Sequence, residues 1–505
     1  MVVDVALYTL VHQPRRLKLP AQPIPRYASI EDITRCLFDE RLNAHYFHQA
    51  ARASYYPGAR MFLNLVREYG LRLALGFSLS FVRQAELWEP GLLDLLRELV
   101  AEEGVELVGV DPYHSLHCLI DLPAFALRMN WMAGELERLF GKRPAVTDTT
   151  EMCISASIYD ALDAAGFRGA LIDGHPSIMQ WRSSNYLYQY GNEQANPFEL
   201  KAPTRPRRSA RNAGRDRQGP PYLSETFNAE GLFLLARHRE LSADVAQHFA
   251  RHAWAGSPLY ADTYARWIAQ AAGDFALLNW DFETLGERHP QETGIFEFIQ
   301  ALPGQLKQQG VELRTPGEII DRHAAEHTYH LPLPVHPPTW SETLGLESGF
   351  AREPQRELFQ LLRDTYSLAR LTEQPELLDL AIWLAQADNF RFLQEPGYQS
   401  SVPLNWWQPG PAEIAREQKQ VYLNALHALE VYLPTRLLRQ AQPASVAPRK
   451  PVRRKATAEL PKDSAEEASA APTRTRTARK SRATASAESA AFVARPKKRA
   501  PKPPE

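Results

Sequence analysis

Short apolar runs alternate with amphipathic helical stretches over the first 325 residues of this chain, and this alternation constrains the fold more than any other feature. Seven runs carry it, at residues 4–11, 71–80, 105–110, 144–150, 169–173, 275–282 and 310–315. Runs that are apolar on both faces and separated by helices are typical of a parallel sheet covered by helices. The pattern predicts an α/β fold, either an open doubly wound sheet or a barrel close to the TIM type.

The remaining stretches differ in composition. Helical periodicity over residues 354–441 predicts a small helical bundle, and a Pro-rich stretch before it marks a domain boundary. Two low-complexity stretches cannot bury enough apolar surface to offset chain entropy. We therefore expect a barrel domain, a flexible insertion, a helical domain and a disordered basic tail, over residues 1–329, about 191–230, 340–441 and 442–505.

The net charge of −1 hides an asymmetry between the tail and the rest of the chain. Residues 441–505 carry 16 Lys and Arg against 6 Asp and Glu, which leaves 42 against 53 for the other residues. Such a tail is either a solvated linker or an arm that makes non-specific, salt-sensitive contacts with a polyanion.

Several features limit the class of protein. No apolar run approaches the ~20 residues of a membrane helix, and the first residues resemble a strand rather than a signal peptide. Cys36, Cys118 and Cys153 are too few and too scattered for a disulfide framework or a zinc site. No Gly-rich phosphate loop follows a strand. We expect a cytoplasmic protein with no cofactor, no metal and no membrane contact, and the oligomeric state stays open.

Polar residues follow the apolar runs where strands would end. Among them are His12, His114, Glu151 and Asp281. In both candidate folds the active site lies at the carboxyl ends of the strands, where such side chains converge. Glu151 and Asp281, on different strands, indicate acid, base or nucleophile chemistry on a neutral, hydroxyl-rich substrate.

Five segments together resemble glycoside hydrolase family 57, in its α-amylase-like branch. They are "YTLVHQPRRL", "TTEM", "WRSSNYLY", "NWDFETLGERHPQETGIFEFI" and "ADNFRF", and they occur in the family's order over roughly residues 5–435. The resemblance implies a (β/α)7 barrel followed by a helical domain. It also implies action on α-glucans with retention of configuration.

The resemblance assigns roles to individual residues. It makes Glu151 the nucleophile and Asp281 the general acid/base of a double displacement. It implies substrate contacts for eight further residues: His12, Gln13, His114, Trp181, Arg182, Asn185, Tyr186 and Asp388. Of these, Asp388 would approach the pocket from the helical domain.

The chain departs from the family pattern at several places. Val110 stands where the family has an acidic residue, and Asp148 stands where its nucleophile segment has an arginine. Phe81 replaces a glycine, Asp173 replaces a glutamate, and Arg288 replaces the histidine after the general acid. Side chains around catalytic groups set their pKa values and the substrate geometry.

Three functions stay open from the sequence. The first is an amylase-like hydrolase or transglycosylase that acts on α-1,4-glucans such as starch, glycogen or maltooligosaccharides. The second, which the departures support, is a degenerate homologue that binds glucan without turnover. The third is a metal-dependent polysaccharide deacetylase-like enzyme, for which His114 and His117 would be candidate ligands. The sequence does not separate hydrolysis from transfer or branching, nor does it fix the preferred chain length.

Overall fold

The apolar runs form the centre of a closed barrel in the computed structural model, which describes residues 2–191, 231–325, 328–337, 353–391, 393 and 411–434. Its parallel strands are β1 (Asp4–Val11), β2 (Leu73–Phe77), β3 (Val105–Gly109), β4 (Val146–Asp148), β5 (Gly169–Ile172), β7 (Phe233–Ala236) and β8 (Phe275–Asp281). Their hydrogen-bonded order is β7-β5-β4-β3-β2-β1-β8. A parallel bridge between Arg237 and Leu277 joins the end of β7 to β8 and closes the ring. The predicted (β/α)7 barrel is therefore confirmed, and the open-sheet alternative is wrong.

The sequence prediction identified one barrel strand wrongly. It took residues 310–315 as the seventh strand, but β9 (Glu312–Leu313) pairs only with the first two residues of β1. The ring instead contains β7, which follows the predicted insertion and which the sequence prediction did not recognise. Beyond it lie β6 (Leu187–Tyr190), antiparallel to β7, and β10 (Thr328–Leu331), parallel to β6.

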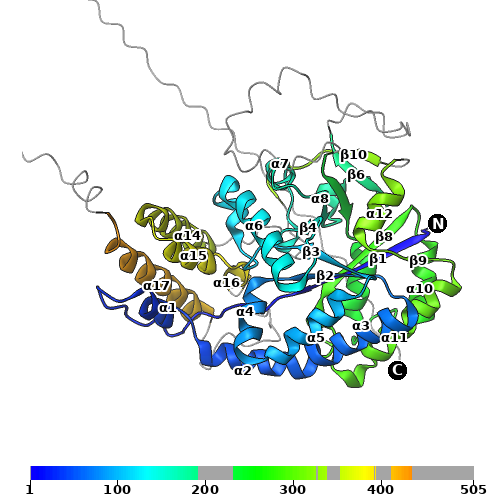
Figure 1. Ribbon diagram of the computed structural model, residues 1–505, viewed down its shortest axis with the longest axis horizontal. Helices are drawn as coiled ribbons and strands as arrows, with labels where there is room; N and C mark the ends of the chain where they lie inside the picture. Colours follow the sequence, from blue (N-terminus) through cyan, green and yellow to red (C-terminus); the bar gives the residue numbers. More distant parts are fainter. Residues whose placement is uncertain are drawn as a thin grey trace, which may run out of the picture. The chain divides into compact units, whose positions relative to one another are not determined.

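Helices cover the outer face of the barrel (Figure 1). The helices of this part of the chain are α1 (Ile30–Leu37), α2 (Glu40–Ala50), α3 (Tyr56–Tyr69), α4 (Leu79–Trp88), α5 (Pro90–Ala101), α6 (Leu122–Phe140), α7 (Ala156–Ala164), α8 (Pro176–Met179), α9 (Arg239–Ala243), α10 (Ala261–Gln270), α11 (Ile295–Gln308) and α12 (Pro316–His323). Among them, α1 lies beside the C-terminal helices, and α12 lies at the amino end of the barrel. Side-chain caps start several of them, because an oxygen at the N-cap satisfies a free backbone amide. Ser78 caps α4 in this way, Asp121 caps α6 and Thr315 forms a capping box on α12.

Two apolar cores explain why the strands are apolar on both faces. Alternate residues such as Ala6 and Tyr8 of β1 fill the barrel interior, whereas Val5 and Leu7 pack against the surrounding helices. Ile320 of α12 belongs to the interior cluster and closes the amino end of the barrel. The carboxyl ends of the strands are left for a site.

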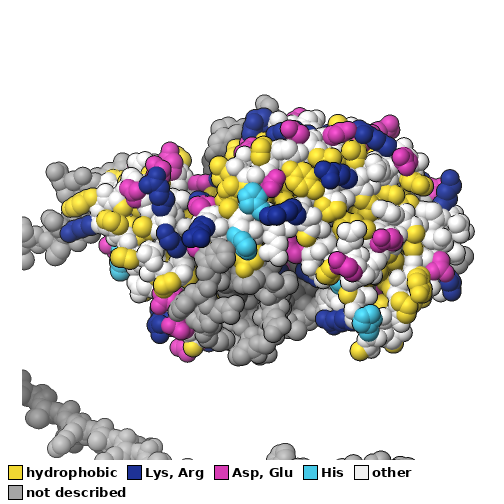
Figure 2. All heavy atoms as spheres, turned by 90° about the horizontal axis from the view of Figure 1, so that it is seen from below, with side chains coloured by type: hydrophobic (Ala, Val, Ile, Leu, Met, Phe, Trp, Pro, Cys, Tyr) yellow, Lys and Arg dark blue, Asp and Glu magenta, His cyan; other side chains and the backbone are white. Residues whose placement is uncertain are grey.

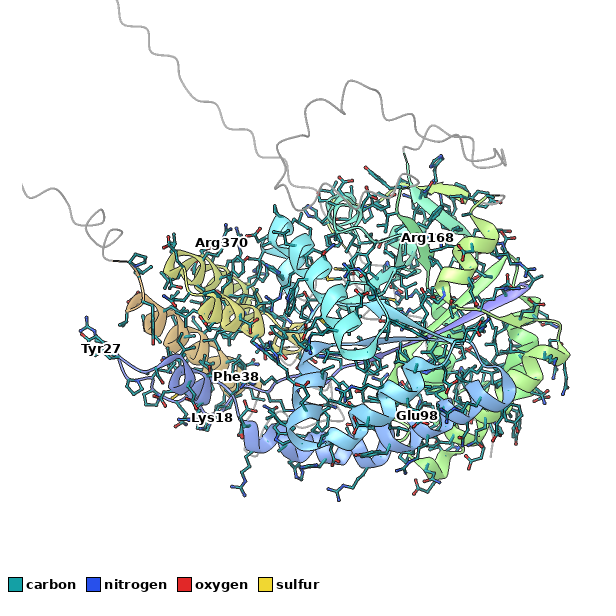
Figure 3. The ribbon with its side chains drawn as sticks, viewed as in Figure 1. Lys18, Tyr27, Phe38, Glu98, Arg168 and Arg370 are labelled. Carbon is teal, nitrogen blue, oxygen red and sulfur yellow. The ribbon has the colours of Figure 1, made fainter. Side chains whose placement is uncertain are left out.

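The C-terminal helices pack against one another and against the barrel. They are α14 (Glu353–Thr372), α15 (Pro375–Leu384), α16 (Ala387–Arg391) and α17 (Pro411–Glu430). Arg370 of α14 donates to Asp121 at the start of α6, with Nη1 and Oδ2 2.6 Å apart (Figure 3). All described residues belong to one compact unit, Met1–Pro443. The predicted insertion and basic tail lie outside the described residues.

The described surface has no strongly charged face in the view of Figure 2. Side chains of Lys and Arg are interspersed there with those of Asp and Glu, over neutral and apolar surface. Within the described ranges, every helix is either too short or too polar to cross a membrane.

Candidate active site

The period of the strands decides which side chains face the barrel interior. Leu277 of β8 lies in the interior cluster, so Asp281, four residues further along the strand, faces the same way. Val146 of β4 lies in the same cluster, and Asp148 follows it by two residues. Glu151 comes directly after β4. Both predicted catalytic carboxylates are therefore at the carboxyl end of the barrel.

Glu151 lies in a strained turn. Its φ of 57° and the φ of 50° at Met152 are in the left-handed region, which residues with a side chain seldom adopt. The Thr150 hydroxyl holds this turn by donating to the Ser115 carbonyl at 2.7 Å. Strain of this kind concentrates at functional sites, where the surrounding structure maintains it. The turn directs the Glu151 side chain into a setting where only 12% of it is exposed.

His114 contacts Glu151 directly. Its Nε2 lies 3.3 Å from Oε1 of Glu151, and its own φ of 52° is left-handed. Burial alone would lower the pKa of His114, but the hydrogen bond and charge of Glu151, with the charges of Asp388 and Asp148, raise that pKa to about 9. The imidazole is therefore protonated at neutral pH and forms an ion pair with Glu151.

His12 connects the barrel to the C-terminal helices. Its Nδ1 lies 2.8 Å from Oγ of Ser78, and its Nε2 lies 3.1 Å from Oδ2 of Asp388. Since the Ser78 oxygen accepts the Phe81 amide, its O–H is available to Nδ1, and Nε2 of His12 then donates to Asp388. Burial lowers the pKa of His12 in spite of Asp388, which agrees with this neutral tautomer. The His12 and His114 ring centres are 4.9 Å apart.

Asp388 reaches the barrel from α16. The amide of the preceding Ala387 donates to the His114 carbonyl at 2.9 Å, which fixes α16 against the site. Burial would raise the pKa of Asp388, but the hydrogen bond from His12 and the charges of His114 and Arg391 lower it below its usual range. The helical domain thus supplies an ionised carboxylate beside His12.

A third carboxyl group, missed by sequence reasoning, lies beneath Glu151. Asp148 is 4% exposed, and its Oδ2 accepts the Tyr8 hydroxyl at 2.8 Å. Its Oδ1 has no hydrogen-bond partner among the residues that the structure describes. Burial raises the pKa of Asp148 to about 7, and the charge of Glu151 adds to this rise. Its position two residues after the inward-facing Val146 is the signal that could have found it.

Asp281 has a simpler setting. Its Oδ2 accepts a hydrogen bond from Nη2 of Arg288 at 3.0 Å, which orients the carboxyl group. In the sheet register Asp281 pairs with Leu10 of β1, and His12 follows Leu10 by two residues. Asp281 is also close enough to Tyr8 for its charge to raise the pKa of that phenol, after burial and Asp148. His12, His114 and Tyr8 thus lie between the two predicted catalytic carboxylates.

Gln13 and Glu283 belong to a buried group on the outer side of β1 and β8. The Gln13 amide nitrogen donates to the Tyr55 hydroxyl at 2.9 Å, and Tyr55 donates to Glu283. Burial, then the charges of Asp281 and Glu287, raises the pKa of Glu283 well above its ordinary value. The structure therefore uses the Gln13 side chain to hold Tyr55, and the side chain is buried.

Asn185 is not brought to the carboxylates. Its carbonyl accepts the amide of Phe275 at 3.3 Å, at the start of β8. Phe275 precedes Asp281 by six residues, which is about 20 Å along a strand. Asn185 thus lies at the amino end of β8, and its substrate contact stays a prediction. Tyr186, the next residue, packs against Tyr329 with ring centres 5.1 Å apart.

Trp181 and Arg182 lie on the surface after α8. Trp181 is 60% exposed, and the Arg182 guanidinium carbon lies 4.6 Å from its ring centre. Their substrate contacts stay predictions.

The departures from the family pattern have structural counterparts. Val110 faces the barrel interior, and Phe81 is part of the outer core. Asp173 is fully buried and pairs with Arg237, at 3.0 Å, and with Arg239. These two guanidinium groups neutralise Asp173 and tie β5 to the end of β7.

The residues considered for a metal do not form a ligand set. Within the described parts of the chain, no group of three or more His, Cys, Asp or Glu side chains is placed to hold a metal ion. His117 lies 3.0 Å from the Tyr366 hydroxyl, and burial lowers its pKa to about 4.

Comparison with known sequences agrees with the motifs. The profile of the family described as glycosyl hydrolase family 57 matches residues 6–201 and 210–332. A relative from Methanocaldococcus jannaschii, named "Putative alpha-amylase", is 26% identical over 437 residues, which cover 84% of this chain and 83% of the relative.

Solved structures share the fold at low sequence identity. The 4-alpha-glucanotransferase from Thermococcus litoralis has a TM-score of 0.54 at 13% identity, over 77% of this chain but only 56% of that enzyme. A branching enzyme from Pyrococcus horikoshii has a TM-score of 0.53 at 11% identity, over 85% of this chain and 89% of the other. An alpha-amylase from Thermotoga maritima has a TM-score of 0.51 at 12% identity, over 87% and 96%. The family profile matches well over half of the residues of this chain, which therefore belongs to glycosyl hydrolase family 57.

Proposed function

We propose that this chain is a retaining glycosidase or transglycosylase that acts on α-1,4-glucans by double displacement. One observation carries the proposal. Glu151 follows one strand and Asp281 ends another strand of one closed barrel, and His12 and His114 lie between them, with His114 against Glu151 and His12 against Asp388.

In the first step Glu151 attacks the anomeric carbon while the glycosidic C–O bond breaks. Asp281 gives its proton to the leaving oxygen, so the leaving chain departs as a neutral alcohol. The product is a glycosyl ester on Glu151. The His114 imidazolium, in contact with Glu151, stabilises the carboxylate that is released when the ester breaks.

In the second step an oxygen of water or of another sugar attacks the same carbon, and the ester C–O bond breaks. Asp281, now a carboxylate, takes the proton of the attacking hydroxyl. Water as the acceptor gives hydrolysis, and a sugar hydroxyl gives transfer. Arg288 holds one oxygen of Asp281 throughout, which leaves the other oxygen for the proton transfers.

Product analysis by carbohydrate chromatography tests this proposal. The full chain is incubated with maltoheptaose and with amylose, beside Glu151→Gln, Asp281→Asn and the control Glu283→Gln. We expect both catalytic variants to lose activity by at least about a thousandfold. The control should stay active, because Glu283 is buried and held by Tyr55, and because burial raises the pKa of its carboxyl, which a neutral amide can then replace.

Each outcome has a distinct meaning. Shorter sugars alone indicate hydrolysis, and products both shorter and longer than heptaose indicate transfer. Glucan binding without any product would favour the degenerate homologue, for which the altered residues around both carboxylates argue. Loss of activity in EDTA would point to the metal-dependent alternative. Full activity in Glu151→Gln would refute the proposed nucleophile.

A further inference from the structure

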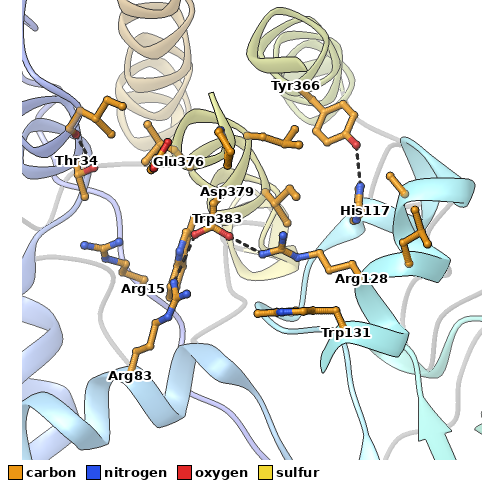
Figure 4. Close-up of a pocket in the computed structure, with 17 residues that line it drawn as sticks. Arg15, Thr34, Arg83, His117, Arg128, Trp131, Tyr366, Glu376, Asp379 and Trp383 are labelled. Carbon is orange, nitrogen blue, oxygen red and sulfur yellow. Dashed lines mark hydrogen bonds and ion pairs between the residues drawn. The ribbon is translucent and has the colours of Figure 1, made fainter. Parts of the chain in front are cut away.

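A cavity of about 700 Å³ lies between the barrel and the C-terminal helices, and neither Glu151 nor Asp281 lines it. Figure 4 shows side chains from α4, α6 and α15 converging on it. Its volume is in the range of small-molecule sites, which are usually apolar with a few placed polar groups. The helix α6 contributes Arg128 and Trp131, and α15 contributes Asp379 and Trp383.

The arginines and Asp379 of this cavity are already paired, and Glu376 is a further charged group of the lining. Asp379 accepts Nη2 of Arg128 at 2.6 Å and the Tyr113 hydroxyl at 2.8 Å, and Arg83 lies 3.4 Å away. Arg15 pairs with Glu40. A guanidinium has five N–H donors, so these pairs leave donors unused. The charges of the three arginines are matched by those of Asp379, Glu40 and Glu376. The lining therefore suits a neutral ligand with many hydroxyl groups better than an anion.

Aromatic rings provide the apolar part of the lining. Trp131 is 46% exposed at the edge of the cavity, although most tryptophans are largely buried. Deeper in, Trp383 stacks on Tyr113 with ring centres 3.9 Å apart. A half-exposed indole beside hydrogen-bonding groups matches a sugar ring, which has one apolar face and polar edges.

The cavity continues into a second one. An adjoining cavity of about 340 Å³ shares Arg15, Thr34, Arg83 and Trp383 with the first and extends past Trp88. Two cavities joined along shared side chains form an extended surface, which suits a chain of several sugar units rather than a single small molecule.

We propose that these joined cavities form a second carbohydrate-binding site that holds several glucosyl units of a long glucan outside the catalytic centre. The choice of glucan as the ligand rests on the function proposed above. A chain held at this distance would raise the local concentration of long substrates at the carboxylates. Short oligosaccharides, which cannot span both sites, would gain nothing.

Trp131→Ala in the full chain tests the second site. Binding is measured in the Glu151→Gln background by electrophoresis through gels with and without amylose. The control is Tyr260→Ala, because Tyr260 is 63% exposed but lines neither cavity. We expect Trp131→Ala to weaken retardation by amylose roughly two- to tenfold, the range for loss of one aromatic contact. With Glu151 intact, Trp131→Ala should raise KM for amylose and leave kcat and KM for maltotriose unchanged.

Several outcomes would overturn the second site. Equal retardation of Trp131→Ala and Tyr260→Ala would do so, as would an equal rise of KM for amylose and maltotriose, which would place Trp131 in the main site. Turnover of maltotriose by a chain that amylose does not retard would reject the second site and leave the proposed function intact. Neither turnover nor retardation with any glucan would reject both.

Discussion

The two predicted catalytic carboxylates are held in opposite ways. Glu151 lies on a left-handed turn, and its partner His114 stands 37 residues away in the sequence. The network continues through His12 to Asp388, which is 376 residues from His12. Asp281 ends a regular strand, and its partner Arg288 is only 7 residues further along. One half of the site is assembled from distant segments, and the other half comes from one contiguous segment.

The electrostatics of the two halves differ in the same way. The partner of Glu151 is a histidine that is charged at neutral pH only because the surrounding carboxylates raise its pKa. The partner of Asp281 is a guanidinium, which stays charged over the whole working range. Activity should therefore change with pH where His114 loses its proton and should be sensitive to single substitutions around Glu151. The charge of Arg288 beside Asp281 should not change with pH.

His114→Gln should have the largest effect on this comparison. We expect kcat/KM to fall by about a hundredfold, because Glu151 loses a preorganised charged donor. In the unsubstituted chain, activity should hold up to pH 8 and decline as the pH passes about 9, where His114 loses its proton. A pH–rate profile checks both points, and the variant should lack the decline near pH 9.

The sign of the stability effect follows from the same pKa. Since the pKa of His114 is raised to about 9 from 6.5, its charge stabilises the fold fully below pH 6.5, and this contribution is lost as pH rises through 9. His175→Gln is the control, because His175 follows a different strand and bonds to Ser177. An unchanged pH profile in His114→Gln would contradict the assignment.

Substitution of Arg288, the partner of Asp281, should have a smaller effect on activity than substitution of His114. Arg288→Ala should lower kcat/KM roughly tenfold, the effect of one lost charge-assisted hydrogen bond. The shape of the pH profile should not change, because a guanidinium does not titrate in this range. Arg288→His tests the difference between the two halves more directly. A histidine at this position should add a new pH-dependent step to the pH–rate profile, near the ordinary histidine pKa of about 6.5. Arg251→His serves as an exposed control, and the same new step in that variant would count against a local effect at Asp281.

The same contrast shows what the sequence could predict. The Asp281 half was predictable because the strand, the carboxylate and the loop after it are contiguous. The barrel was predictable because its strands are apolar on both faces. The strand β7 was missed because it is four residues long and follows an insertion. The buried pair Tyr8 and Asp148 was missed because it joins residues 140 positions apart. The position of Asn185 at the amino end of β8 could not be predicted, because a sequence motif does not show which end of a distant strand it contacts.

Asp148→Asn should have the smallest effect on activity and tests whether the Glu151 half tolerates a neutral group beneath it. Since the pKa of Asp148 is raised to about 7 from 3.8, the fold favours the protonated acid, and stability falls as pH rises through 7. Asparagine is neutral at every pH, so near pH 5 activity should stay within about twofold of the unsubstituted chain.

The stability of Asp148→Asn should depend on pH in a way that its activity does not. Its gain in stability over the unsubstituted chain should be larger at pH 8 than at pH 5, by up to about 2.7 kcal/mol, because roughly two pKa units of the shift lie between pH 5 and pH 7. Thermal unfolding at both pH values measures it. Asp173→Asn is the contrasting control: it removes the buried carboxylate that Arg237 and Arg239 share, so it should destabilise the fold at both pH values. An equal change for Asp148→Asn at pH 5 and pH 8 would mean that Asp148 is ionised throughout, and that Glu151 lies above a second negative charge.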